Sequence, residues 1–473
     1  MHAAAAAPSD PPARRADGNF CVIISVGMWL LIASYLEMPV STTHSCVGGM
    51  VGMTIAIKGG DCVVWYEKGD TDNMHLPQGI VAIILSWFIS PVLSAFFAVT
   101  LFFTVRTFVL RHVNAFDRAS IFYPILIWFA VWINAFFIMS KGIKKKICPK
   151  DEEDVWCCKE PGKVDAGIAA GFTCGIAFVV MLACIPLVKW IKQKVESDIE
   201  REISRKDVKV EVEEEVEEEP PEGYAEKMIW KAKRAVISSL NTDVHKSIVE
   251  DELVSAIHAN AEKFDAKTER YFRYIQIFTA ICDSFAHGAN DVANAVGPYM
   301  ALYAIYKTGY VESKTSGSEN DALWILTIGG LGIGAGLLIY GHKIMRAIGV
   351  KLAVITPSRG TSIELGAAMV IIFGSYLGLP LSTTHCQVGA TTGVALLEGK
   401  EGVNKVVLLK AVVGWIITLV VVGLSTGLLV AQGIFAPVSD VIQDTMLEER
   451  CPSYMLDNPD VLRDAFDELM PTA

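Results

Sequence analysis

Charged residues are scarce in this sequence. Lys, Arg, Asp and Glu make up 20% of the 473 residues, whereas 52% are hydrophobic and the mean hydropathy is +0.40. This composition excludes a series of water-soluble domains, so the length of the chain indicates how many membrane spans it can form. Six apolar runs are long enough to cross a bilayer as helices: Phe20–Met38, Ile80–Phe103, Ile121–Met139, Ala166–Trp190, Ala322–Tyr340 and Ala411–Phe435. Shorter or interrupted runs bring the total to about ten hydrophobic elements: Cys46–Ile57, Tyr271–Tyr306, Ile363–Leu379 and Val388–Leu397.

Other absences narrow the function. The eleven cysteines show no paired spacing of the kind that metal-binding modules have. No small-residue cleavage site follows the first apolar run, which therefore indicates a membrane span and not a signal peptide. No nucleophile-elbow motif surrounds Ser41 or Ser382, so a membrane hydrolase is disfavoured and we expect no enzyme activity. The glycine-rich Gly329–Gly336 has no strand before it, so close helix packing explains it better than nucleotide binding.

One long hydrophilic segment divides the hydrophobic elements into two groups. The sequence predicts a first transmembrane repeat over residues 1–191, a polar loop over 192–267, a second repeat over 268–436 and a polar tail over 437–473. Much of the net charge of −11 comes from Glu211–Glu219, which we interpret as a solvated acidic stretch. Apolar residues at near-helical spacing predict helix within Ala225–Phe264.

Three cysteines share one polar loop. If this loop faces the outside, we expect a disulfide between Cys148 and either Cys157 or Cys158. The alternative is three free thiols.

An internal repeat gives the strongest indication of architecture. Leu36–Ala56 reads LEMPVSTTHSCVGGMVGMTIA and Leu377–Leu397 reads LGLPLSTTHCQVGATTGVALL, with nine of twenty-one positions identical. Weak duplication with polar breaks inside apolar segments is typical of repeat-built secondary transporters. Packing alone gives no reason to repeat Ser-Thr-Thr-His.

Each copy of the repeat carries the pattern of an anion site. A proline, Pro39 or Pro380, interrupts the chain two residues before a serine that can cap the following helix. The free N–H groups and the positive end of that helix favour an anion, with hydroxyls as further donors. The predicted phosphate-binding residues are Ser41, Thr42, Thr43, Ser382, Thr383 and Thr384. Hydroxyls that bond back to their own helix are the alternative.

A buried acid predicts a cation site. Asp291 lies in the middle of an apolar segment, with Asn290 and Asn294 on the same helical face, and these oxygens suit a hard cation such as Na⁺. Gly288, together with Gly297 and Pro298, predicts local unwinding that would expose further carbonyls. Glu364 is a second candidate for a cation or a proton.

The membrane potential gives a reason for the anion site and the cation site to occur in one protein. An anion that enters a cell held at about −100 mV works against about 2.3 kcal/mol per charge, so its uptake needs accompanying cations.

These residues carry a specific family resemblance. The run Gly288–Ala295 reads GANDVANA, Ile355–Glu364 reads ITPSRGTSIE and Trp87–Ser94 reads WFISPVLS. Together with the two S-T-T-H copies, they resemble the inorganic phosphate transporter family over most of both hydrophobic groups. The pattern AEKFDAKT at Ala261–Thr268 resembles its eukaryotic, usually sodium-coupled branch.

The resemblance implies an all-α polytopic membrane protein of two inverted repeats with broken or re-entrant helices. It implies a symporter of inorganic phosphate with sodium ions, whose site is formed by Asp291, Asn290, Asn294, Glu364 and the two Ser-Thr-Thr runs. The coupling ion, sodium or a proton, is the only cofactor expected, and the bilayer is the expected surrounding. We expect no nucleic-acid partner, a plasma-membrane location and possible homo-oligomers. The family topology places the large loop in the cytosol, although Lys141–Lys163, with seven lysines, would favour the reverse orientation.

The chain departs from the family pattern in one respect. The family has a G-A-N-D motif ahead of each S-T-T-H, whereas this chain has one, 94 residues before His385. The missing copy would fall about fifty residues before Met1, and the first repeat also lacks a counterpart of Glu364. We therefore expect an upstream segment of about two helices; a transcript without upstream coding sequence would contradict this.

Two other functions stay open. A non-transporting phosphate sensor on the same fold would bind without flux. A divalent-metal transporter would use His44 with Cys46 and His385 with Cys386 as soft ligands, and would not depend on Asp291.

Overall fold

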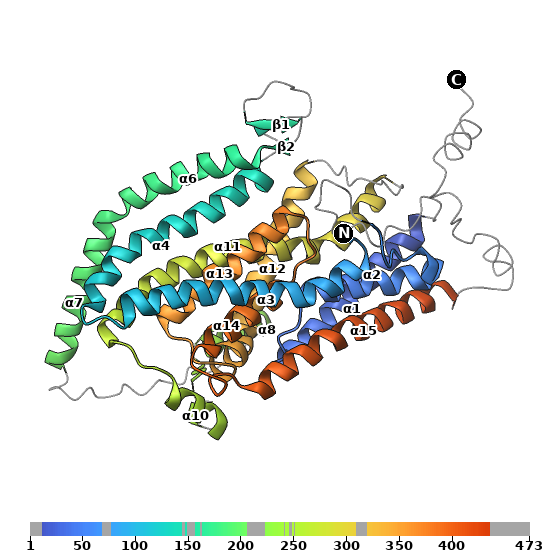
Figure 1. Ribbon diagram of the computed structural model, residues 1–473. Coiled ribbons are helices and arrows are strands. Elements are labelled where there is room, and N and C mark those ends of the chain that lie inside the picture. The colour runs from blue at the N-terminus through green and yellow to red at the C-terminus, as the bar shows by residue number, and fades with distance from the viewer. Residues whose placement is uncertain are drawn as a thin grey trace.

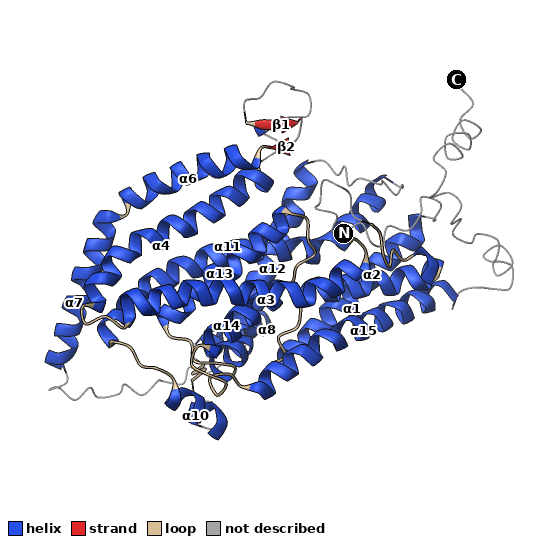
Figure 2. Ribbon diagram, viewed as in Figure 1, coloured by secondary structure: helices blue, strands red, loops and turns tan. Residues whose placement is uncertain are grey.

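The computed structural model is nearly all-helical (Figure 2) and describes residues 12–68, 77–143, 147–148, 157–160, 163–205, 223–240, 242–245, 248–249, 251–308 and 319–435. The first group of elements is α1 (Pro12–Tyr35), α2 (Thr42–Lys58), α3 (Ile80–Val105), α4 (Ala115–Phe137), β1 (Cys158–Glu160), β2 (Lys163–Val164), α6 (Ala166–Ala183) and α7 (Ile185–Arg205). The polar segment holds α8 (Tyr224–Leu240) and α10 (Glu252–Asn260). The second group is α11 (Ala266–Thr308), α12 (Glu319–Arg346), α13 (Pro357–Tyr376), α14 (Thr383–Leu396) and α15 (Lys405–Phe435).

Within the described residues, six helices are long and apolar enough to cross a membrane, namely α1, α3, α4, α6, α12 and α15. They coincide with the six long apolar runs, so the predicted membrane fold is confirmed. The run Ala166–Trp190 differs in detail, because the chain forms two helices there, with a break at Cys184. Pro186 lies in the first turn of α7, where its missing N–H costs no helical bond. The helices predicted in Ala225–Phe264 are α8 and α10, whereas Glu211–Glu219 and the tail lie outside the described residues.

The duplicated sequence folds as two helical hairpins, α1–α2 and α13–α14. Helix α14 has 14 residues and rises about 21 Å, short of the about 30 Å hydrocarbon core. Each tip turns at a residue with left-handed backbone, Glu37 (φ 57°) in the first and Gly378 (φ 74°) at the equivalent place in the second. Glycine adopts this conformation freely, whereas Glu37 is held by ion pairs with Lys351 (2.7 Å) and Arg346 (3.3 Å).

The tips of the two hairpins meet inside the bundle. The Thr43 hydroxyl donates to the carbonyl of Leu381 (3.4 Å), and the Thr384 hydroxyl donates to the carbonyl of Val40 (3.1 Å). These bonds are equivalent, because Thr43 and Thr384, like Val40 and Leu381, are 341 positions apart. Hairpins that enter from opposite ends and touch at their tips have the geometry of inverted repeats.

The helix after each hairpin packs against the other hairpin. In Figure 1 α15 lies along α2, and α14 packs along α3 in the same way. A Cβ added at Gly48 would lie 2.8 Å from the Leu419 carbonyl oxygen, and one at Gly389 would overlap the backbone of Pro91. Gly52 against Gly423, and Gly393 against Ala95, repeat this contact one turn later. Small residues thus let the two halves approach at backbone distance.

Helix α11 corrects one expectation. It is continuous from Ala266 to Thr308, so the predicted unwinding at Gly288, Gly297 and Pro298 is wrong. Each of these residues weakens a helix by a limited amount, and packing against α1, α4 and α13 offsets that cost. The continuous helix leaves no unwound segment here, although Pro298, which has no N–H, cannot bond to the carbonyl of Asn294.

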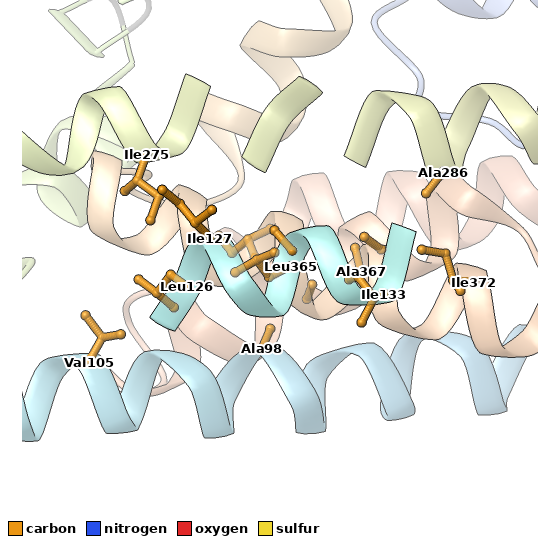
Figure 3. Packing of buried hydrophobic residues seen from close by; sticks show 14 of the residues in the cluster. Ala98, Val105, Leu126, Ile127, Ile133, Ile275, Ala286, Leu365, Ala367 and Ile372 are labelled. Atoms are coloured by element: carbon orange, nitrogen blue, oxygen red, sulfur yellow. The ribbon is translucent and has the colours of Figure 1, made fainter. Parts of the chain in front are cut away.

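The main apolar core joins α3, α4, α11 and α13. Figure 3 shows Ala98 and Val105 of α3 together with Leu126 and Ile127 of α4 among the buried residues of this cluster, which also includes Ile275, Ala286, Leu365, Ala367 and Ile372. This core fixes α11 beside the second hairpin, and so positions its polar face.

Candidate functional site

The Ser-Thr-Thr runs begin helices α2 and α14, as the sequence predicts. Ser41 is the N-cap of α2 and accepts from the backbone N–H of His44 (3.3 Å), and Ser382 caps α14 through His385 at the same distance. Both serines are buried. Two helix N-termini, one from each repeat, therefore open toward one point inside the bundle.

Asp291 lies between these N-termini. The Thr42 hydroxyl donates to its Oδ1 (3.1 Å), and the Thr383 hydroxyl donates to its Oδ2 (2.8 Å). Thr42 and Thr383 are equivalent residues of the repeat, so the carboxylate is bound alike by the two halves. Both hydroxyls thus bond to α11 and not back to their own helices, and the bond from Thr42 crosses the boundary between the repeats.

The two asparagines differ in their contacts. Asn294 is buried and its Nδ2 donates to Thr43 Oγ1 (2.9 Å) and to Asp291 Oδ1 (3.4 Å). Asn290 is half-buried, and its Oδ1 accepts from the Ser375 hydroxyl (3.4 Å) on α13. Asn294 belongs directly to the Asp291 cluster, whereas Asn290 links α11 to the second hairpin.

Glu364 lies in a separate polar cluster. It accepts hydrogen bonds from Thr279 and from Gln276 (3.4 Å) of α11. Thr279 precedes Asp291 by twelve residues, a rise of about 18 Å along the helix. The sequence predicts Glu364 in one site with Asp291, whereas in the structure the two acids lie in separate clusters.

The stretch between the clusters holds an acid that sequence reasoning missed. Asp283 is 9% exposed and its carboxylate lies 3.3 Å from His287 Nε2, one turn further along α11. The signal was present, because Asp283 is an acid in an apolar segment just as Asp291 is. A polar face thus runs along α11 from Gln276 to Asn294.

The repeated histidines also lie together. His44 and His385 are fully buried, and their rings meet edge to face with centroids 4.6 Å apart. Each ring also contacts the tryptophan of the helix that follows its hairpin, His44 with Trp87 (5.1 Å) and His385 with Trp415 (3.7 Å).

Comparison with known proteins decides the family. The sequence matches the phosphate transporter family over residues 6–426. This chain belongs to that family.

Relatives of this phosphate transporter chain span most of its length. The phosphate-repressible phosphate permease pho-4 of Neurospora crassa is 28% identical, over 91% of this chain and 85% of its own. Sodium-dependent phosphate transporter 1 of Xenopus tropicalis is 25% identical, over 88% of this chain and 83% of its own. A solved structure described as the sodium-dependent phosphate transporter has a TM-score of 0.62 and 25% identity, covering 91% of this chain and 82% of the other.

The ligands required by a metal transporter do not gather at His44 and His385. Among the described residues, the one group of three or more His, Cys, Asp or Glu with ligand atoms within 4.8 Å of one another is Cys148, Cys157 and Cys158. Cys148 and Cys158 form a disulfide there, which resolves the choice that the sequence left open.

Proposed function

We propose that this member of the phosphate transporter family carries inorganic phosphate across the membrane together with sodium ions. The observation that supports this most directly is Asp291, whose two carboxylate oxygens are bound by one hydroxyl from each repeat.

The oxygens around Asp291 suit a hard monovalent cation. Both carboxylate oxygens, the hydroxyls of Thr42 and Thr383, and the Oγ1 of Thr43 converge through the bonds described above. Hard cations take oxygen ligands of this kind. When a cation sits on the carboxylate, the hydroxyl hydrogens no longer need to point at Asp291.

Those hydroxyls then become donors for phosphate. They sit in the first turns of α2 and α14, where backbone N–H groups and the helix dipoles favour an anion. The phosphate site therefore lies between Ser41, Thr42, Thr43 and Ser382, Thr383, Thr384, with the cation site at its edge.

Electrostatics makes the cation a precondition for phosphate. Two like unit charges about 4 Å apart repel by about 4 kcal/mol at an effective dielectric constant of about 20. A phosphate beside a bare Asp291 carboxylate would be disfavoured by such an amount, and a bound cation removes this penalty. This shared carboxylate is a physical basis for obligatory coupling.

Sodium is favoured over a proton as the coupling ion because the Xenopus relative and the solved structure are both described as sodium-dependent. The Cys148–Cys158 disulfide indicates that its loop faces an oxidising compartment, which fits the plasma membrane. Glu364, with Thr279 and Gln276, offers a second cation site on the same polar face.

The test is radiolabelled phosphate uptake by transporter-deficient cells that display this chain, with Na⁺ or with choline. We expect sodium-dependent uptake, and we expect Asp291→Asn at matched surface level to lower it more than about tenfold, since an intramembrane charge that binds the ion is lost. Thr100→Val is a matched control, because Thr100 bonds back to Phe96 of its own helix, away from the site. Phosphate binding without uptake by the folded chain would contradict symport and support the sensor.

A further inference from the structure

The open end of hairpin α13–α14 carries an ion-pair network that plays no part in the site above. Arg359, in the first turn of α13, is 1% exposed, and its Nη2 lies 2.8 Å from Oε1 of Glu398, just beyond α14. The guanidinium lies near the rings of Phe102 and Phe264, 5.6 Å and 5.3 Å from their centroids. This pair ties the two ends of the hairpin together.

Glu262 joins that pair to α3. It lies in the linker between α10 and α11, and its carboxylate accepts from Arg111 Nε (2.8 Å) and Nη2 (2.9 Å) and pairs with Arg106. Its backbone N–H donates to Glu398 Oε2 (2.9 Å), and its carbonyl accepts from Arg359 Nη2 (2.9 Å). One residue of the polar segment therefore bridges α3 to both ends of the hairpin.

The network is charged and partly shielded from water. The hydrogen bond from Arg111 holds the pKa of Glu262 below its ordinary range, so the carboxylate stays ionised near neutral pH. Arg359 and Glu398 are the network's most buried pair, and removing either one would leave a buried charge without its partner.

The first hairpin and α15 carry uncharged residues at the three corresponding positions. By the repeat offsets, Arg359 and Glu398 correspond to Gly18 and Ile57, and Arg106 corresponds to Ile434. Ile57 and Ile434 belong to one apolar cluster with Met53, and Gly18 lies against Met53. The ion pairs at the end of α13–α14 are therefore a feature of the second hairpin that the repeat does not share at these positions.

We propose that Glu262, with Arg106, Arg111, Arg359 and Glu398, is a latch that closes the transport pathway on the α10 face of the bundle. Release of Glu262 removes the bridge from Arg111 to the Arg359–Glu398 pair, while the bond from Arg106 Nη1 to the Leu397 carbonyl (3.1 Å) remains. This weakening of the closed end lets the Asp291 site open to that face, which the proposed topology places in the cytosol. Helix α10 operates the latch, because it docks through buried Val254 and Ile257 and through His258, whose Nε2 lies 3.1 Å from the Val350 carbonyl oxygen. The polar segment would thereby regulate phosphate release.

Two native cysteines report the latch. Cys386 lies in the first turn of α14 beside the site and is 0% exposed, whereas Cys46 in α2 is 2% exposed and belongs to the other hairpin. Opening at the α10 face exposes Cys386 alone, whereas general unfolding exposes both.

The experiment measures alkylation of the two cysteines in inside-out vesicles by a membrane-impermeant maleimide, with peptide mass spectrometry of the full chain. We expect Glu262→Gln to speed Cys386 labelling on the order of tenfold, the size of a typical coupling between two states, and to leave Cys46 unchanged. Arg111→Gln, at a more exposed partner, should give a smaller increase. The control Asp117→Asn breaks the ion pair with Lys192 (2.7 Å) elsewhere in the bundle and should change neither rate.

Equal Cys386 rates in wild type and Glu262→Gln, or parallel increases at Cys46, would overturn the latch. The latch rests on the proposed symport only in its consequence, the regulation of phosphate release. Faster Cys386 labelling in a chain without phosphate uptake would contradict symport and support the latch. Sodium-dependent uptake with unchanged Cys386 labelling would support symport and contradict the latch.

Discussion

At the scale of single residues, the site depends on two threonines that the repeat makes equivalent. Thr42 and Thr383 each hold one oxygen of Asp291, at 3.1 Å and 2.8 Å. A hydrogen bond to a charged group contributes about 1.5–3 kcal/mol, and here each one also orients the carboxylate toward its ligand.

We therefore expect Thr42→Val and Thr383→Val to weaken the apparent affinity for sodium to a similar extent, by roughly tenfold or more. Sodium titrations of phosphate uptake at matched surface level would measure this. Thr104→Val, whose hydroxyl bonds back to Thr100 of its own helix, serves as the control. A large effect of one substitution without the other would show that the two halves do not share the carboxylate.

At the scale of helices, the inverted halves are joined by glycines at two equivalent crossings. Gly48 and Gly52 of α2 lie against α15, and Gly389 and Gly393 of α14 lie against α3. Side chains at these positions would force α2 away from α15 and α14 away from α3. The N-termini of α2 and α14 would then no longer both lie beside Asp291.

Gly48→Ala and Gly389→Ala should each destabilise the protein by about 1–3 kcal/mol, the usual cost of overpacking. Thermal unfolding of the detergent-solubilised chain, followed by size-exclusion chromatography, would show the loss as a lower midpoint. Gly433→Ala on α15 meets nothing within 4 Å and should not lower it. Unchanged midpoints in both crossing variants would mean that the helices do not pack this closely.

At the scale of the whole molecule, the disulfide and the latch lie at opposite ends of the bundle. Figure 1 shows β1, which begins at Cys158, and β2 at the end away from α10. Because disulfides form in oxidising compartments, we expect the β1–β2 end to face outward and the polar segment to face the cytosol. This orientation runs against the seven lysines of Lys141–Lys163, whose five neighbouring acids offset them.

Intact cells should therefore show Cys148 and Cys158 alkylated by an impermeant maleimide only after treatment with an impermeant reductant. A cysteine introduced at Ser238, an exposed position of α8, should react only in inside-out vesicles. The reverse labelling pattern would invert the topology, and with it the direction in which the latch opens.

The amino-acid sequence by itself determined the membrane class, the positions of the spans, the duplication and the serine caps, because hydrophobicity, helix capping and repetition act over a few residues or over one helix. It also singled out Asp291, since an acid inside an apolar run is costly wherever that run lies. Helix continuity at Gly288 and Pro298 could not be foreseen, because it depends on packing against other helices.

Only the tertiary structure decided which groups meet. Thr42 and Asp291 are 249 positions apart, and their contact requires the crossing of both hairpins with α11. The separation of Glu364 from Asp291, the choice of Cys158 as the partner of Cys148, and the bridge from Glu262 to Arg359 are of the same kind. The chemistry of a side chain decides which ligands and bonds it can accept. The distance between two residues far apart in the chain is set by how the helices between them pack.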